Sequence, residues 1–188
     1  MHPRLAELVN YTIAQRSTLL EAVATVPEPH RDERTQTGTW SIAEVLEHLH
    51  RVERGIARLL ERAIERGRQA GIPQEREAGS LLNSLDAYDL TRRDRPIVAP
   101  DPVMPRGEYT AAQGLAALAL SREALLTAIR SGDGLALGEL TFPHPVFGSL
   151  DLYQWILFVG QHEARHAAQI AEIGRALAGD LGIARGSP

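Results

Sequence analysis

Two residue types are missing from this 188-residue sequence. It contains no cysteine and no lysine, so all 20 of its basic residues are arginine. Without cysteine there can be no disulfide framework, no protein thiolate nucleophile and no cysteine-ligated metal site. Without lysine there is no Schiff-base chemistry and no P-loop lysine for phosphate. Any metal ion that the chain binds must therefore be held by histidine, aspartate or glutamate.

The sequence also lacks a strong charge of either sign and any long apolar run. Its formal net charge is −4 at pH 7, which gives no basic field for a nucleic-acid backbone. Arginines alternate with glutamates, as in Glu53-Arg54 and Glu61-Arg62, a pattern typical of solvated helix surface. No window approaches the roughly 18 apolar residues of a membrane span, and the first residues contain no apolar signal core. We therefore expect a cytoplasmic protein with no membrane segment and no nucleic-acid partner.

Apolar residues recur with helical periodicity along most of the chain. The pattern predicts four long helices, separated by segments rich in proline and glycine. The expected helices cover approximately residues 4–26, 41–68, 110–130 and 151–178. Ser41 with Glu44 three residues later forms a capping box, which marks the start of the second helix. The strand signal is weak, and its best stretch, 138–142, is short.

A long connection, residues 69–109, separates the second and third expected helices. Its segment 96–102 cannot be helical, because each proline lacks an N–H donor and restricts the residue before it. Residues 80–90 are compatible with a short additional helix. A connection of this length usually crosses a bundle or covers a site. We expect one all-α domain spanning 1–188, a four-helix bundle with a long crossover between helices two and three.

His162 and His166 are the most informative pair of polar residues. They stand four residues apart on the fourth expected helix, so their side chains lie one turn apart on one face. At about 100° per residue, His166 falls near the middle of the apolar stripe and His162 within roughly 50° of it. Two inward imidazoles one turn apart suit the binding of a single metal ion. The alternative is a pair of core histidines satisfied by hydrogen bonds.

The same pair matches the zinc-protease pattern H-E-x-x-H. We disfavour a metalloprotease because no histidine follows His166 and position 169 is glutamine. The only later glutamate, Glu172, is too close in sequence to be the further ligand. Those enzymes also need a sheet beside the helix, which this sequence does not predict.

A third metal ligand must come from another helix. His48 lies at the edge of the buried stripe of helix 41–68, whereas His50 is expected on its outer face. Three histidines with open coordination positions would form a catalytic type of site rather than a structural one. A hydrated boundary histidine is the alternative for His48. His144, between two prolines, is expected in a turn or at the rim of a site.

Two motifs together resemble those of the DinB/YfiT-like superfamily. The first is WSIAEVLEHL at 40–49, followed by Glu53. The second is HPVFGSL at 144–150, followed by Trp155 and by HEARHAAQI at 162–170. The resemblance covers most of the chain, although the first and third helices match in pattern alone.

The resemblance implies a four-helix bundle that carries a divalent metal ion on three histidines, which map onto His48, His162 and His166. Zinc or nickel is the expected ion, with iron or manganese as alternatives, since geometry and availability decide between them. Better-understood relatives transfer low-molecular-weight thiols such as bacillithiol or mycothiol, or isomerise substrates with the help of a thiol.

The resemblance also implies a homodimer. The residues themselves offer one hint of it, in apolar side chains that lie off the main stripes, such as Leu19, Leu46 and Phe158.

These observations support a metal-dependent enzyme acting on a small molecule, either a thiol S-transferase or a hydrolase. Because the chain has no cysteine, any thiolate must arrive with a cosubstrate, whereas metal-activated water would serve a hydrolase. Glu163 is the candidate catalytic residue, as a base or as a partner that orients a ligand histidine; the alternative is a surface glutamate paired with an arginine. Glu53 falls within the buried stripe and needs a partner, for which Arg165 or a ligand N–H are candidates. The alternative function is a non-catalytic metal-binding bundle, such as a stress-associated dimer.

Overall fold

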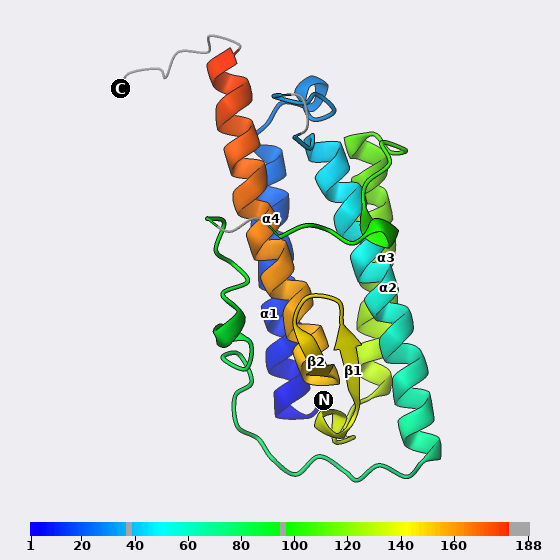
Figure 1. Cartoon of the computed structure of the whole chain (residues 1–188). Helices are drawn as coiled ribbons and strands as arrows, with labels where there is room; N and C mark the ends of the chain where they lie inside the picture. Colours follow the sequence, from blue (N-terminus) through cyan, green and yellow to red (C-terminus); the bar gives the residue numbers. More distant parts are fainter. Residues whose placement is uncertain (37–38, 95–96, 181–188) are drawn as a thin grey trace.

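Four long helices form the body of the molecule. The computed structural model describes residues 1–36, 39–94 and 97–180. The helices are α1 (Pro3–Ala24), α2 (Ile42–Gln69), α3 (Ala111–Ser131) and α4 (Leu152–Asp180). Helix α1 packs along α4, and α2 packs along α3 (Figure 1). The predicted all-α four-helix bundle is confirmed, and each helix begins and ends within about two residues of its expected bounds.

The two packed pairs consist of parallel helices. Helices α1 and α4 run in one direction, and α2 and α3 run in the other (Figure 1). Because α2 and α3 are parallel, the chain must return along the whole length of the bundle between them, which explains the long crossover. None of the helices in the described part of the chain combines the length and apolar character that crossing a membrane requires.

Local hydrogen bonds define where α2 and α3 begin. The Ser41 hydroxyl accepts from the Glu44 N–H, and the Glu44 carboxylate accepts from the Ser41 N–H, which confirms the expected capping box. Thr110 and Gln113 form the same reciprocal pair at the start of α3. Each box satisfies backbone donors that the first turn of a helix leaves without partners.

In its described parts, residues 70–94 and 97–110, the crossover contains two short helical turns, η2 (Asp86–Tyr88) and η3 (Asp101–Val103). It passes beneath the bundle from the end of α2 and rises beside α4 (Figure 1). Residues 97–103 then cross the front of the bundle toward α3 (Figure 1). A further turn, η1 (Glu28–His30), lies between α1 and α2.

A β-hairpin precedes α4 and was only partly anticipated. Strands β1 (Thr141–His144) and β2 (Gly148–Asp151) pair antiparallel, after the short turn η4 (Leu137–Glu139). The weak strand signal at 138–142 covers only the start of β1. Gly148 has a φ of +76°, a conformation that glycine adopts without strain. The hairpin lies over the front of the bundle, so that its tip is directed toward the crossing segment (Figure 1).

The core is divided into two hydrophobic clusters. The cluster at the hairpin end includes Leu5, Leu8, Leu60, Ile64, Leu125, Ile129 and Ile156. The cluster at the opposite end includes Leu19, Val23, Ile42, Leu46, Leu118 and Ile170.

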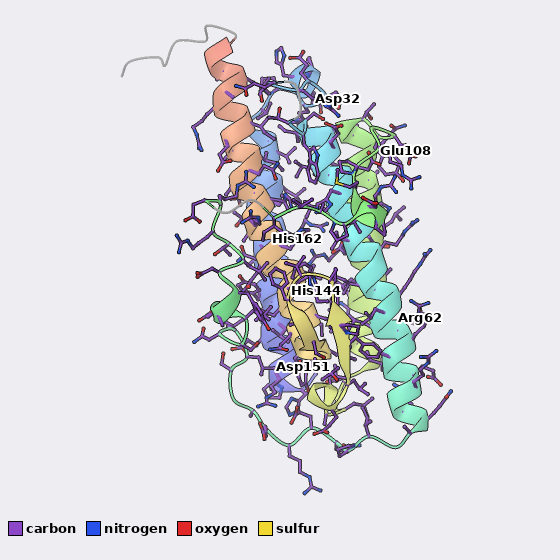
Figure 2. The ribbon with its side chains drawn as sticks, in the orientation of Figure 1. Asp32, Arg62, Glu108, His144, Asp151 and His162 are labelled. Carbon is purple, nitrogen blue, oxygen red and sulfur yellow. The ribbon has the colours of Figure 1, made fainter. Side chains whose placement is uncertain are left out.

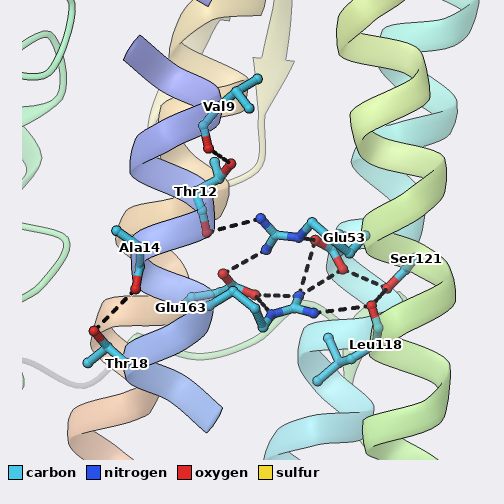
Figure 3. Close-up of polar contacts among 10 residues, drawn as sticks. Val9, Thr12, Ala14, Thr18, Glu53, Leu118, Ser121 and Glu163 are labelled. Atoms are coloured by element: carbon cyan, nitrogen blue, oxygen red, sulfur yellow. Dashed lines mark hydrogen bonds and ion pairs between the residues drawn. The ribbon is translucent and has the colours of Figure 1, made fainter. Parts of the chain in front are cut away.

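Between these clusters lies a layer of buried charges, one from each helix, which we call the ion layer: Arg16, Glu53, Arg122 and Glu163. The Arg16 guanidinium contacts Glu53 at 3.0 Å and Glu163 at 2.7 Å (Figure 3). Arg122 contacts both Glu53 and Glu163 at 2.7 Å. The side chains of Glu53 and Glu163 are only 3% and 2% exposed, so these pairs are formed out of water.

The partners of Glu53 differ from those expected. Instead of Arg165 or a ligand histidine, its carboxylate contacts Arg16 and Arg122 and accepts a hydrogen bond of 2.6 Å from the Ser121 hydroxyl. The expectation was wrong because periodicity shows that Glu53 is buried but not which helix its face meets. Arg165 instead donates to the carbonyl groups of Leu90 and Arg92 in the crossover.

Arg122→Met is predicted to destabilise the fold by about 3–5 kcal/mol, because it leaves the buried carboxylates short of one positive charge. The free energy of unfolding would be measured by urea titration followed by circular dichroism. In the matched double variant Arg122→Met/Glu163→Leu the charges stay balanced, so its loss should be smaller than the sum of the two single losses. If the double variant instead lost the full sum of the two single losses, Arg122 and Glu163 would not be energetically coupled.

Candidate metal centre

Three predicted histidines meet at the front of the bundle, one from α2 and two from α4. The Nε2 atom of His162 lies 3.1 Å from the Nε2 of His48 and 3.1 Å from the Nε2 of His166. The three ligand atoms lie within 4.8 Å of one another. Two nitrogens bound to one ion at 2.0–2.1 Å, with an angle of 90–109° between them, would be about 2.8–3.4 Å apart. The observed spacing therefore suits a shared divalent cation.

Hydrogen bonds on the far sides of the rings orient two of these imidazoles. His48 Nδ1 donates to the Val103 carbonyl at 2.8 Å, and His166 Nδ1 donates to the Gln169 side-chain oxygen at 2.7 Å. A neutral imidazole that donates through Nδ1 carries a lone pair on Nε2. The lone pairs thus face the centre, and metal-binding histidines are commonly held by such a second hydrogen bond.

Burial also keeps these rings unprotonated. It lowers the pKa of His48, and it lowers the pKa values of His162 and His166 well below the ordinary histidine range. For His162, the neighbouring imidazoles of His166 and His48 lower the pKa further. All three side chains are therefore neutral at pH 7, the state in which histidine binds a metal ion.

A cavity of about 1040 Å³ adjoins the three histidines. Trp40 forms part of its wall, with its ring centroid 5.0 Å from that of His48 and 6.4 Å from that of His166. Phe158 forms another part and stacks on His162 at 5.1 Å. Figure 2 shows His162 on α4 and His144 on the hairpin, on the same face of the bundle. The cavity is lined by residues of α2, α4, the hairpin tip, the crossing segment and the segment before α2.

Glu47 attaches the crossover to α2 beside this site. Its fully buried carboxylate accepts the backbone N–H groups of Arg106 and Gly107 at 3.0 Å and that of Glu108 at 3.2 Å. Burial would raise the pKa of Glu47, but the hydrogen bonds from the Arg106 and Glu108 N–H groups and from Arg51 lower it. The role of Glu47 in holding the crossover was not predicted from the sequence. The one available signal was its position directly before the predicted ligand His48.

The other histidines that the sequence singled out lie in different surroundings. His50 is 8% exposed and packs near the Tyr109 ring, so its expected place on the outer face was wrong: α3 covers that side of α2. His50 does not belong to the three-histidine group. His144 is the last residue of β1 and one of the residues that line the cavity.

The carboxylate of Glu163 is directed away from the histidines. Its oxygens pair with Arg16 and Arg122 in the ion layer, and burial raises its pKa against the opposing effect of these two arginines. It therefore pairs with arginine, as the alternative interpretation expected, but in the interior rather than at the surface. No contact in the described structure connects it to a ligand imidazole.

The three residues that hinted at a dimer are buried within the single chain. Leu19 and Leu46 belong to the second hydrophobic cluster, and Phe158 is 5% exposed beside the cavity. They therefore provide no free apolar surface, and the homodimer stays a prediction based on the resemblance alone.

The fold and the site together define a helical bundle with a histidine cluster between α2 and α4. The sequence profile of the DinB superfamily matches residues 11–170. The uncharacterized protein YuaE of Bacillus subtilis (strain 168) is 34% identical over 135 residues, which cover 71% of this chain and 76% of YuaE. The chain belongs to the DinB superfamily.

The fold also resembles the crystal structure of TT2238, described as a four-helix bundle protein. The TM-score is 0.60 at 21% sequence identity, and the match covers 89% of this chain and 98% of TT2238. At this identity the likeness supports the fold alone.

Acid is predicted to destabilise the metal-free protein through these histidines. Their folded pKa values lie below the unfolded value near 6.5, so below that pH the unfolded chain binds more protons and the free energy of unfolding falls. The fall should approach about 1.4 kcal/mol per pH unit for His162 and for His166, whose pKa values lie well below the ordinary range. Urea titrations in chelator at pH 7, 6 and 5 would measure it. In the triple variant His48→Gln/His162→Gln/His166→Gln the free energy of unfolding should depend clearly less on pH. An unchanged pH dependence would show that these histidines are not its cause.

Proposed function

We propose that this protein is a metal-dependent enzyme that holds a divalent cation on His48, His162 and His166. The observation that carries the proposal is the convergence of three Nε2 atoms, with neighbouring pairs 3.1 Å apart, at the wall of a large cavity. Zinc or nickel suits an all-imidazole donor set, and iron or manganese is the alternative. The proposal includes a cytoplasmic homodimer, as the family resemblance implies.

A cation on three protein ligands keeps open positions and lowers the pKa of a bound water or thiol, which supplies a nucleophile at neutral pH. The chain's own residues provide the rest. Val103 and Gln169 hold ligand imidazoles in place, and Trp40 and Phe158 shield one side of the site from water. Because no cysteine is present, a thiol nucleophile would come from a cosubstrate such as bacillithiol or mycothiol.

The cavity favours an enzyme over a metal store or sensor. Small-molecule sites typically enclose about 300–1,000 Å³ and are mainly apolar, and this cavity of about 1040 Å³ has mainly apolar walls that include Val52, Ile56 and Leu59. A site that only stores metal has no need of such a space. The two reaction classes that fit are thiol S-transfer to an electrophile and hydrolysis.

Protein purified without a histidine tag is predicted to bind about one zinc or nickel ion per chain. Elemental analysis and calorimetric titration would measure the stoichiometry and the affinity. His48→Ala, His162→Ala and His166→Ala should each weaken binding by at least about tenfold, since each removes one ligand. His50→Gln is the matched control on the same helix and should bind like the wild type. Wild-type protein that takes up no divalent metal would overturn the proposal.

The nucleophile can be identified with two model reactions of the metal-loaded protein. Conjugation of 1-chloro-2,4-dinitrobenzene with bacillithiol or mycothiol tests thiol transfer, and p-nitrophenyl acetate without thiol tests hydrolysis. We expect turnover in one of them at least about tenfold above that of His162→Ala, because that variant lacks a ligand. A fully metal-loaded protein that is inactive in both would favour the non-catalytic metal-binding bundle.

A further inference from the structure

His144 has a fixed hydrogen-bonding pattern at the hairpin tip. Its Nδ1 atom accepts the backbone N–H groups of Val146 at 3.1 Å and Phe147 at 3.3 Å. A nitrogen that accepts two N–H groups carries no hydrogen, so the proton of the neutral ring is on Nε2. His144 is therefore the opposite tautomer to His48 and His166, and it presents a donor where those residues present a lone pair.

Three aromatic rings hold this imidazole in one orientation. Its ring centroid lies 4.7 Å from that of Phe147, 4.9 Å from that of Trp155 and 4.7 Å from that of Phe158. Burial in this setting lowers the pKa of His144 to about 4, so that it stays neutral at pH 7. A neutral donor held by aromatic neighbours at the hairpin tip is suited to specific recognition.

His144 lines the same cavity as the metal centre. Phe158 contacts both His144 and His162, so the two imidazoles share an aromatic neighbour. Nδ1 is directed into the turn, and the Nε2 edge is therefore directed away from it. Within residues 1–36, 39–94 and 97–180, no hydrogen-bond acceptor contacts Nε2. An oriented donor beside a ligand cavity is thus left for a bound molecule.

We propose that His144 is a substrate-binding residue whose Nε2–H donates a hydrogen bond to an oxygen atom of the substrate. This inference rests on the proposed function and specifies its substrate class: an apolar or aromatic compound with a carbonyl, nitro or carboxylate oxygen near the reacting atom. The apolar body would occupy the cavity, and the oxygen would face His144. A neutral donor placed in this way stabilises negative charge that develops on such an oxygen during the reaction.

The first test is the protonation state of the ring. Long-range ¹H–¹⁵N spectra of protein labelled at histidine, assigned with His144→Asn, should show the Nε2–H tautomer at pH 7 and a titration midpoint near pH 4. An Nδ1–H tautomer, or a protonated ring at pH 7, would overturn the proposal. This measurement needs neither metal nor substrate, so its outcome is independent of the proposed enzymatic function.

The second test uses benzohydroxamate, an aromatic ligand with metal-binding oxygen atoms, and a matched pair of variants. His144→Asn keeps an acceptor near the position of Nδ1 and removes the distal donor, whereas His144→Gln keeps an N–H near the position of Nε2. With zinc loaded, the Kd from calorimetry should rise about tenfold in His144→Asn and less than about threefold in His144→Gln. Equal affinity in His144→Asn and wild type would overturn the inference.

Zinc content measured on the same samples distinguishes the proposed role of His144 from the proposed metal site. Normal zinc content in both variants shows that a change in benzohydroxamate affinity comes from the donor and not from a damaged metal site. Failure of the wild type to bind zinc would reject the proposed function itself, whatever the tautomer of His144.

Discussion

The four-way pairing of Arg16, Glu53, Arg122 and Glu163 is the constraint on which the rest of the structure depends. Apolar side chains tolerate small shifts and can repack, whereas a buried charge that loses its partner is left at a cost of several kcal/mol. One charge from each helix therefore defines the height and rotation at which the helices can meet. Glu163 and His162 are consecutive on α4 and leave it about 100° apart, so the turn of α4 that directs Glu163 into the ion layer directs His162 toward the cavity.

The crossover connects this bundle to its proposed chemistry. Parallel packing of α2 and α3 requires a long return, and that return ends in hydrogen bonds to two consecutive residues of α2, Glu47 and His48. The same segment orients a proposed metal ligand and closes one side of the cavity. The hairpin closes another side and supplies His144. The crossover and the hairpin thus both complete the chain topology and form the site. Long loops carry functional residues in many proteins.

Two neutral histidines whose Nε2 lone pairs face the centre, and His144, which offers a hydrogen, make a chemically asymmetric cavity. The difference arises from backbone and side-chain partners at Nδ1: a carbonyl or amide oxygen for His48 and His166, and two N–H groups for His144. In the proposed enzyme His48, His162 and His166 would bind the cation, and His144 would bind the substrate. A neutral imidazole has one nitrogen with a lone pair and one with a hydrogen, so histidine can fill both roles at neutral pH.

The features that depend on local order could be predicted from the sequence: four helices, the capping box at Ser41, and the pairing of His162 with His166 one turn apart. Helical period and capping act over a few residues, so they can be recognised without a fold. Only the tertiary structure decided which faces meet. It buried His50 under α3, gave Glu53 two arginines in place of Arg165, enclosed Leu19 and Leu46 within the chain, and brought Glu47 to the crossover. These outcomes depend on contacts between residues far apart in sequence. The sequence of one helix does not specify which residues of the other helices pack against it.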